Sequence, residues 1–329
     1  MKLQILIPHY KETAEEIKPL LDSIALQQSI DFDEVGVIIC HDGNDIPNFV
    51  FGGNFPDIYP FKIEQISISH KGVSATRNAC LDHATAEYVM FCDADDMFLN
   101  ACGLYIIFRE MDQGFDTLLS CFVEETRKPD TKEVIYVNHE MDSTFVHGKV
   151  HRRQYLIDNH IRWNDNLTIH EDSYFNILCQ NLTTSVKYCQ MPFYLWKWRA
   201  NSVCRHDPKY ILKTYNNMLD SNSALIKEFL KRGLMEKAMF YVTFMVFDAY
   251  YLMNKPDWIN QENKDYRDKT EMRFKRYLLE NEELWNTMPI PNKMQISNQV
   301  RGRSISEGMQ MEAVTVDGWL KHIKELKDG

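Results

Sequence analysis

The chain has 329 residues, of which 44% are hydrophobic and 26% are charged, as in folded globular proteins and unlike disordered chains. This length exceeds what one hydrophobic core usually supports, so we expect two units. The formal net charge of −10 disfavours non-specific binding to nucleic acid or anionic lipid, and a small-molecule or glycan partner is favoured instead.

The cysteines indicate a reducing environment. Eight are present, none forms a C-x-x-C pair, and several lie inside apolar runs such as VGVIIC at 35–40. This pattern predicts buried thiols rather than disulfides or a zinc site. The sequence has no run of about 18 apolar residues and no signal-peptide pattern, so we expect no membrane span and favour the cytoplasm.

The first third of the sequence alternates between strand and helix patterns, which is typical of an α/β layer with mostly parallel strands. Thr13 and Glu16 form a capping-box pattern, which predicts a helix that runs to about residue 24. Pro19 either falls in the first turn of a helix that begins later or kinks the helix. Strands are expected at 3–7, 35–40, 64–68 and 87–92, and further helices at 73–85 and 101–112.

The rest of the chain changes character twice. Residues 117–149 form short alternating segments that favour antiparallel strands, so we expect a mixed sheet. Beyond Asp207 the pattern is helical, and this predicts an α/β domain over 1–207 and a helical domain over 208–329. Helices are expected at 150–160, 171–181, 209–231, 233–253, 266–284 and 313–327, a short strand at 186–189, and irregular structure over 285–310.

The segment FCDADD, residues 91–96, places Asp93, Asp95 and Asp96 directly after an apolar strand. The carboxyl ends of parallel strands open onto the ligand crevice of an α/β sheet. Crowded carboxylates are tolerated when a divalent cation offsets their charge, and oxygen ligands suit Mg²⁺ or Mn²⁺. A solvated acidic turn would have the same composition, so this motif alone leaves both interpretations open.

Several segments together resemble glycosyltransferase family 2. IPHYKE at 7–12 is similar to the family's hydrophobic-P-x-Y-N-E opening, and CHDGND at 40–45 to its D-D-G-S-x-D nucleotide-base motif. HKGVSATRNACLDHATAEYVMF at 70–91 resembles the segment that precedes the family's D-x-D-D motif. The resemblance implies a GT-A fold, a Rossmann-like mixed sheet flanked by helices, in which 1–100 bind the nucleotide sugar and 101–207 form the acceptor side and a closing loop.

The resemblance implies a role for each donor-side residue. Asp42 would bond the base, where a carboxylate can accept from the N–H of a uracil-like edge, and Asp95 would hold the metal. Lys11 and His41 stand where the family usually has Asn and Asp. For His41, a ring that hydrogen-bonds to the backbone is favoured over a catalytic role. The implied nucleotide-pocket residues are Pro8, Tyr10, Glu12, Arg77, Asp93 and Ala94, and the further metal ligands are Asp93 and His206.

Two later motifs complete the implied site. LTIHEDSYFNIL at 167–178 resembles the family's E-D-x-x-F acceptor motif, which implies Asp172 as general base with Glu171 beside it. The alternative is that both carboxylates only supply negative charge to the first turn of a helix. YLWKWRANSVCRH at 194–206 resembles the loop that closes over the diphosphate, which implies phosphate contacts from Arg199 and Ser202.

These features imply an inverting, metal-dependent glycosyltransferase that moves a hexose or N-acetylhexosamine from a nucleotide sugar, with UDP favoured, to a hydroxyl of a glycan or cell-surface polymer such as teichoic acid. Transfer to a modified DNA base or a protein side chain stays open. So do a nucleotidyltransferase and a non-catalytic nucleotide-sugar-binding module, although the first lacks a Gly-rich phosphate loop here. The C-terminal helices would serve the acceptor or a homo-oligomer, and basic residues such as Arg273, Lys275 and Arg276 would meet an anionic acceptor or form a solvated face.

Overall fold

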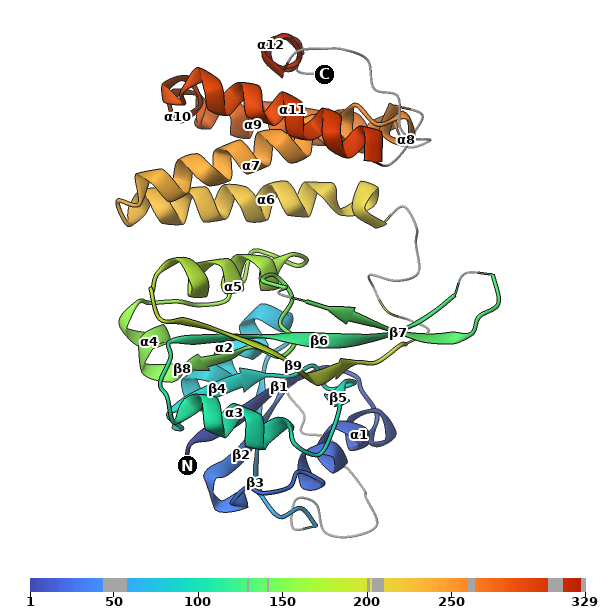
Figure 1. Cartoon of the computed structure of the whole chain (residues 1–329), viewed down its shortest axis with the longest axis vertical. Coiled ribbons are helices and arrows are strands. Elements are labelled where there is room, and N and C mark those ends of the chain that lie inside the picture. The colour runs from blue at the N-terminus through green and yellow to red at the C-terminus, as the bar shows by residue number, and fades with distance from the viewer. Residues whose placement is uncertain are drawn as a thin grey trace. The chain divides into compact units, whose positions relative to one another are not determined.

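A computed structural model describes residues 1–43, 58–128, 130–140, 142–199, 202, 210–259, 264–306 and 316–326. The chain divides into two compact units, Met1–Val203 and Cys204–Gly329. Figure 1 shows strands and helices in the first unit and, among the described residues, helices alone in the second. The domain boundary predicted at 207 falls among residues 203–209, outside the described part, and the roles assigned to the domains remain predictions.

The first unit is built on one mixed sheet with the strand order β3-β2-β1-β4-β8-β6-β9-β5, in which β7 pairs with β6. Strands β1 to β4 are parallel, whereas β8 is antiparallel to β4 and β6. This topology confirms the predicted α/β class and the mixed sheet. The strands are β1 Leu3–His9, β2 Val35–Asp42, β3 Lys62–Ile68, β4 Tyr88–Phe91, β5 Met97–Phe98, β6 Thr117–Arg127, β7 Val134–His139, β8 Val150–Arg152 and β9 Val186–Trp196.

Helices cover both faces of the parallel strands, which explains why the sequences of β1 and β2 are almost continuously apolar. Side chains of α1 and α3 share one core cluster with Leu3, Ile5 and Ile7 of β1. Helix α2 packs against β1 and β2. The helical elements of this unit are α1 Ala14–Ala25, the 3₁₀ helix η1 Phe32–Glu34, α2 Val73–His83, α3 Gly103–Met111, α4 Arg153–Asp158 and α5 Glu171–Asn181.

Helix α1 begins where the capping box predicts. The Thr13 N–H donates to Glu16 Oε2 at 2.8 Å, and the helix starts at Ala14. Pro19 lies inside the helix rather than in its first turn, because Ile17, Leu20 and Leu21 are fully buried and their packing offsets the hydrogen bond that proline cannot make.

The second unit is helical, as the pattern after Asp207 predicts. Helix α7 packs against α6, α10 and α11, and α9 packs against α6 and α12. The prediction of irregular structure over 285–310 is wrong, since α10 and α11 occupy most of it. Prolines at 289 and 291 obscured this boundary, but proline is well tolerated in the first turn of a helix such as α11. The helices are α6 Tyr210–Lys231, α7 Met235–Met253, α8 Pro256–Ile259, α9 Lys264–Glu280, α10 Glu282–Thr287, α11 Ile290–Ser306 and α12 Val316–Glu325.

Smaller differences from the predicted elements occur at the acceptor side. The strand expected at 186–189 extends to Trp196, because β9 pairs with β6 along its length across an irregularity between Ser120 and Phe122. Residues 150–152 form a short strand before α4 rather than its first turn. Within the described residues, none of the helices has the length and apolar character needed to cross a membrane.

Candidate active site

A cavity of about 450 Å³ lies at the carboxyl ends of β1, β2 and β4. These ends meet at one edge of the sheet, where an open α/β sheet binds its ligands. The structure brings together here eight side chains that the motifs single out: Pro8, Tyr10, Glu12, Asp42, Arg77, Asp93, Ala94 and Asp95. The lining also includes residues that the sequence interpretation missed, namely His9, His70, Gly72, Val73 and Thr76.

Asp42 anchors the loop that enters α2. Its carboxylate accepts hydrogen bonds from the Lys71 N–H at 2.7 Å and the Gly72 N–H at 2.9 Å, and it contacts His70 Nδ1 at 2.8 Å. Gly72 has a φ of +93°, a conformation that favours glycine over residues with a side chain. A carboxylate offers about four lone pairs, so Asp42 keeps one for a ligand in the cavity.

Tyr10 and His70 form a planar wall of the cavity. Their rings are stacked with centroids 4.5 Å apart and planes inclined by 13°. Tyr10 is 48% exposed and His70 is also exposed, and Lys11 Nζ lies 4.6 Å from the centre of the Tyr10 ring. The ring pair therefore keeps exposed aromatic surface beside the cavity. His70 stands at the start of the 70–91 segment, and only the fold shows that it lies beside Tyr10.

The substituted histidine of the base motif is buried against a second histidine. His41 Nδ1 lies 3.0 Å from His9 Nδ1, and His41 Nε2 lies 3.0 Å from Gln65 Oε1. Burial, with His9 adding to it, lowers the pKa of His41 to about 4, so the ring is neutral at pH 7. His9 Nε2 lies 2.8 Å from the Glu12 carbonyl oxygen. Both rings can make these contacts while neutral. His9 Nε2 then donates to the Glu12 carbonyl and His41 Nδ1 donates to His9 Nδ1, so His41 Nε2 accepts from the NH₂ group of Gln65. His41 is therefore held by side-chain contacts to Gln65 and to His9, and of the two histidines it is His9 that lines the cavity.

Arg77 links the acidic turn after β4 to the first turn of α5. Its guanidinium donates to Asp93 Oδ1 at 2.8 Å and to Glu171 Oε1 at 2.9 Å, and it lies 4.4 Å from the centre of the Trp163 ring. Arg77 is 4% exposed. Burial by itself raises the pKa of the Asp93 carboxyl. The charge of Arg77 beside it outweighs this effect and holds the pKa of Asp93 below its ordinary value. A buried arginine paired on two sides holds both carboxylates in fixed positions.

Asp95 faces the cavity and is paired with Arg199. Arg199 Nη1 donates to Asp95 Oδ2 at 2.7 Å, and Nη2 donates to Glu16 Oε1 at 2.8 Å. Burial and the charge of Asp93 raise the pKa of Asp95, and Arg199 opposes that rise. In this structure Arg199 thus supplies the positive charge that the acidic turn requires.

Asp96 and His147 lie behind this turn. Tyr194 OH donates to Asp96 Oδ2 at 2.6 Å and accepts from the Asp93 N–H at 3.2 Å, which fixes the Asp93–Asp95 backbone. His147 Nδ1 is buried without a hydrogen-bond partner among the described residues and lies 3.7 Å from Asp96 Oδ2. Asp93, Asp96 and His147 offer three ligand atoms within 4.8 Å of one another, a set compatible with a divalent cation. No sequence signal pointed to His147, which β-strand pairing brings from a distant segment.

Asp172 lies in the first turn of α5, after His170 in a left-handed conformation. Burial and the neighbouring Glu171 raise the pKa of Asp172 to about 7. Its Oδ1 accepts a hydrogen bond from the Ser173 N–H at 2.8 Å. A carboxylate with a pKa near 7 is suited to accept a proton at neutral pH.

The closing-loop residues are only partly described. Ser202 is half-buried, and its N–H donates to the Arg199 carbonyl oxygen at 3.4 Å. His206 and Cys204 lie outside the described residues. Neither Arg199 nor Ser202 lines the cavity, although Arg199 contacts Asp95, which does.

The model of the family described as "Glycosyl transferase family 2" matches residues 4–174, more than half of the chain. The chain belongs to glycosyltransferase family 2. This membership confirms the family that the sequence motifs resemble, and the matched range contains the cavity and the Glu171–Asp172 motif.

Curated relatives of this family 2 chain include poly(ribitol-phosphate) beta-N-acetylglucosaminyltransferase TarS from two strains of Staphylococcus aureus, Mu50 and MW2. Each is 24% identical over 186 residues, which covers 54% of this chain and 32% of the relative. The chain therefore spans about a third of the length of the curated relatives it matches.

Solved structures similar to this family 2 chain include the crystal structure of S. aureus TarS 1–349, with a TM-score of 0.60, 16% identity and coverage of 97% of this chain and 95% of that one. The same protein in complex with UDP has a TM-score of 0.60 and 15% identity, covering 99% and 90% of the two chains. Its complex with UDP-GlcNAc has a TM-score of 0.60 and 17% identity, covering 97% and 95%. These likenesses confirm the predicted GT-A fold followed by a helical region.

Proposed function

We propose that the chain is an inverting glycosyltransferase that moves a sugar from a UDP-sugar to a hydroxyl acceptor. The observation that carries this proposal is the cavity in which the base-motif carboxylate Asp42 and the acidic turn Asp93–Asp95 lie at one sheet edge. Arg77 joins that edge to Glu171, the neighbour of the proposed base. Family membership and the UDP and UDP-GlcNAc complexes of TarS support a nucleotide-sugar donor.

The donor base would lie against the wall formed by Tyr10 and His70. A stacked aromatic face suits any base, and the remaining lone pair of Asp42 would accept the imide N–H that distinguishes uracil. Pro8 and Glu12 complete the pocket lining. This arrangement supports uridine as the nucleoside.

The acidic turn fits a divalent cation, Mn²⁺ or Mg²⁺. Asp93 and Asp95 supply hard oxygen ligands at the cavity, and His206 is a further candidate ligand. When bound, such a cation neutralises the diphosphate leaving group. Arg199, which pairs with Asp95 here, would then be available to contact a phosphate together with Ser202.

The acceptor hydroxyl would lose its proton to Asp172. Burial keeps this carboxyl poised near neutral pH, and Glu171 is held in place by Arg77. Glu171 is thereby a positioning residue, and Asp172 is the general base that touches the acceptor.

The acceptor class is proposed to be a glycan or a cell-surface polymer, with TarS, a poly(ribitol-phosphate) transferase by name, as support. We also propose a cytoplasmic location, because all seven described cysteines are free thiols and six of them are buried. The exposed rings of Phe240 and Phe244 on α7 support a homo-oligomer, which sedimentation of the full chain would test.

The decisive experiment measures products from UDP-GlcNAc with Mn²⁺ and a polyol-phosphate acceptor. We expect release of UDP and a transferred sugar whose anomeric configuration, read by NMR, is inverted. In a parallel reaction with UTP and a sugar 1-phosphate, release of pyrophosphate would instead indicate a nucleotidyltransferase. Binding of UDP-GlcNAc by calorimetry, without hydrolysis or transfer to any acceptor of a broad panel, would overturn the proposal in favour of a binding module.

A further inference from the structure

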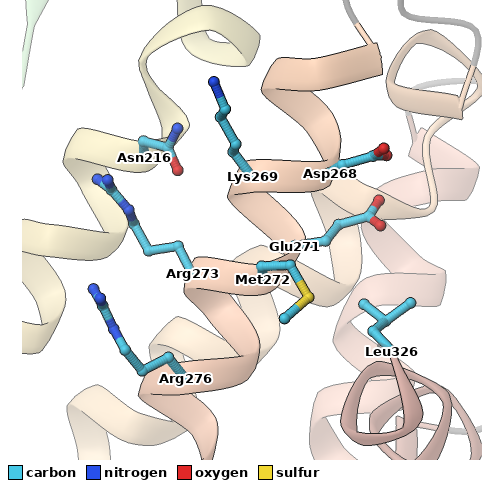
Figure 2. A pocket seen from close by; sticks show the side chains of 8 residues that line it. All are labelled: Asn216, Asp268, Lys269, Glu271, Met272, Arg273, Arg276 and Leu326. Atoms are coloured by element: carbon cyan, nitrogen blue, oxygen red, sulfur yellow. The ribbon is translucent and has the colours of Figure 1, made fainter. Parts of the chain in front are cut away.

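A second cavity, of about 690 Å³, lies within the helical unit between α6, α9 and the residue that follows α12. Figure 2 shows its lining from close by. Lys269, Arg273 and Arg276 project from α9 toward the helix that carries Asn216, whereas Asp268 and Glu271 project from the other side of α9. No family motif covers this cavity, because the family match ends at residue 174.

The three cations lie along one face of α9. Residues spaced four and three apart in a helix share a face, and seven residues rise about 10 Å. Lys269 is exposed and makes no hydrogen bond or ion pair with any described residue. The side chain of Arg276 is 60% exposed, with Glu280 as a partner at 3.9 Å. Only Arg273 is closely paired, to Asp220 at 2.6 Å.

The acidic groups of the lining are already engaged elsewhere. Asp268 Oδ2 accepts from Lys264 Nζ at 2.5 Å, and Glu271 Oε1 accepts from the indole N–H of Trp258 at 3.0 Å. Asp268 and Glu271 therefore neutralise little of the positive charge that α9 presents toward α6. Of the three cations, Lys269 is the one that pairs with no described residue, and in a chain with a net charge of −10 it is positioned beside a cavity to receive an anion.

The opposite wall holds an unsatisfied polar group. Asn216 Oδ1 is buried and has no hydrogen-bond partner among the described residues. Buried polar groups in native proteins normally have a partner, so this oxygen is a candidate acceptor for a hydroxyl donor of a bound ligand.

We propose that this cavity binds neighbouring phosphates of a polyol-phosphate polymer, the acceptor class of the proposed function, on which this inference rests. A volume of about 690 Å³ is larger than a single phosphate requires and suits a short polymer segment. Lys269 and Arg276 are both exposed and lie two helical turns apart on one face of α9, which suits a ligand with repeated charges. Nucleic acid fits less well, because none of the described residues that line the cavity is aromatic and could stack on bases.

The test measures binding of a synthetic ribitol-phosphate oligomer to the full chain by calorimetry, without nucleotide sugar. Lys269→Glu and Arg276→Glu should each weaken binding about tenfold, the equivalent of one lost charge-assisted contact. The matched control is Lys231→Glu, an exposed lysine near the end of α6 outside the cavity lining, which should bind as the parent does. Circular dichroism would establish that all three variants keep their helices.

Several outcomes would overturn the proposal. Unchanged oligomer binding in Lys269→Glu and Arg276→Glu is one, and equal weakening by Lys231→Glu is another. Tighter binding of a single-stranded DNA oligomer of equal charge would point to a different ligand. In turnover assays the two cavity variants should raise KM for the oligomer about tenfold and leave UDP binding unchanged, whereas failure of the proposed function would abolish UDP binding or transfer in the parent chain itself.

Discussion

The cavity of the first unit and the cavity of the helical unit hold their charges in opposite ways. In the first unit the charged side chains are paired with one another, and Arg77, which joins Asp93 to Glu171, is buried. In the helical unit Lys269 and Arg276 of α9 are exposed, and Lys269 pairs with no described residue. Buried pairs act at short range with fixed geometry, whereas exposed charges are screened by salt. The first cavity is thus suited to chemistry on one defined ligand, and the second to weaker recognition of repeated charge.

The strongest test of this contrast is Asp95→Ala. We expect turnover of UDP-GlcNAc to fall about 10³-fold, since Asp95 is a cation ligand under the proposed function, and such a ligand contributes several kcal/mol. UDP binding by calorimetry should also lose its dependence on Mn²⁺. Glu16→Gln is the matched control, because Glu16 shares Arg199 with Asp95 but does not line the cavity, and glutamine keeps the capping box. Comparable losses in both variants would assign the effect to Arg199 rather than to a cation site.

Asp172→Asn should reduce kcat by about 10²- to 10³-fold and leave the Kd for UDP unchanged, as expected for a general base. In the parent, kcat should rise with pH and level off above about 7, because the base acts in its deprotonated form and its pKa is raised to about 7. Measured pH profiles of both proteins check this assignment. A variant that turns over normally, or that keeps the rise near pH 7, would show that another group removes the proton.

Asp248→Asn tests how a buried carboxyl of the helical unit affects the free energy of unfolding. The test does not depend on catalysis. Burial raises the pKa of Asp248 from 3.8 to about 7, and its Oδ2 has no hydrogen-bond partner among the described residues. The folded state therefore holds the proton more tightly than the unfolded state, so stability is greatest below about pH 4 and falls as pH rises through 7. The loss amounts to at most about 4 kcal/mol above pH 8.

Urea unfolding at pH 5 and pH 8.5 measures this effect. The asparagine variant cannot ionise, so its advantage over the parent should appear at pH 8.5 and shrink at pH 5. Asp265→Asn, at an exposed position of α9, should differ from the parent equally at both pH values. An Asp248→Asn variant with no pH-dependent advantage would mean that Asp248 is solvated in the folded state.

The smallest expected effect belongs to the exposed wall of the first cavity. Tyr10→Ala should weaken UDP binding about tenfold, since stacking of a base on an aromatic ring contributes roughly 1–3 kcal/mol. Tyr10→Phe keeps the ring and should bind as the parent does. Calorimetry with UDP separates the two, and equal weakening in both variants would assign the contact to the hydroxyl instead of the ring.

Much of the first cavity was predictable from local sequence, for a physical reason. Pro8, Asp42 and Asp95 each follow or end an apolar strand, and the carboxyl ends of parallel strands meet at one edge. His70 and His147 could not be found this way. His70 is defined by its stacking on Tyr10, and His147 by its approach to Asp96 across the sheet. Prolines at 289, just before α11, and at 291, in its first turn, concealed a helix that packing on α7 and α12 stabilises.

The sequence alone determined the strand and helix order of the α/β unit, the family, and the carboxylates at the strand ends, because periodicity and strand-end motifs are local properties of the chain. Only the tertiary structure decided which charges are paired. It placed Arg77 between Asp93 and Glu171, Arg199 on Asp95, and the row of cations on α9 beside Asn216. Those contacts join residues from separate elements, and their strength depends on burial and distance, which the order of residues does not specify.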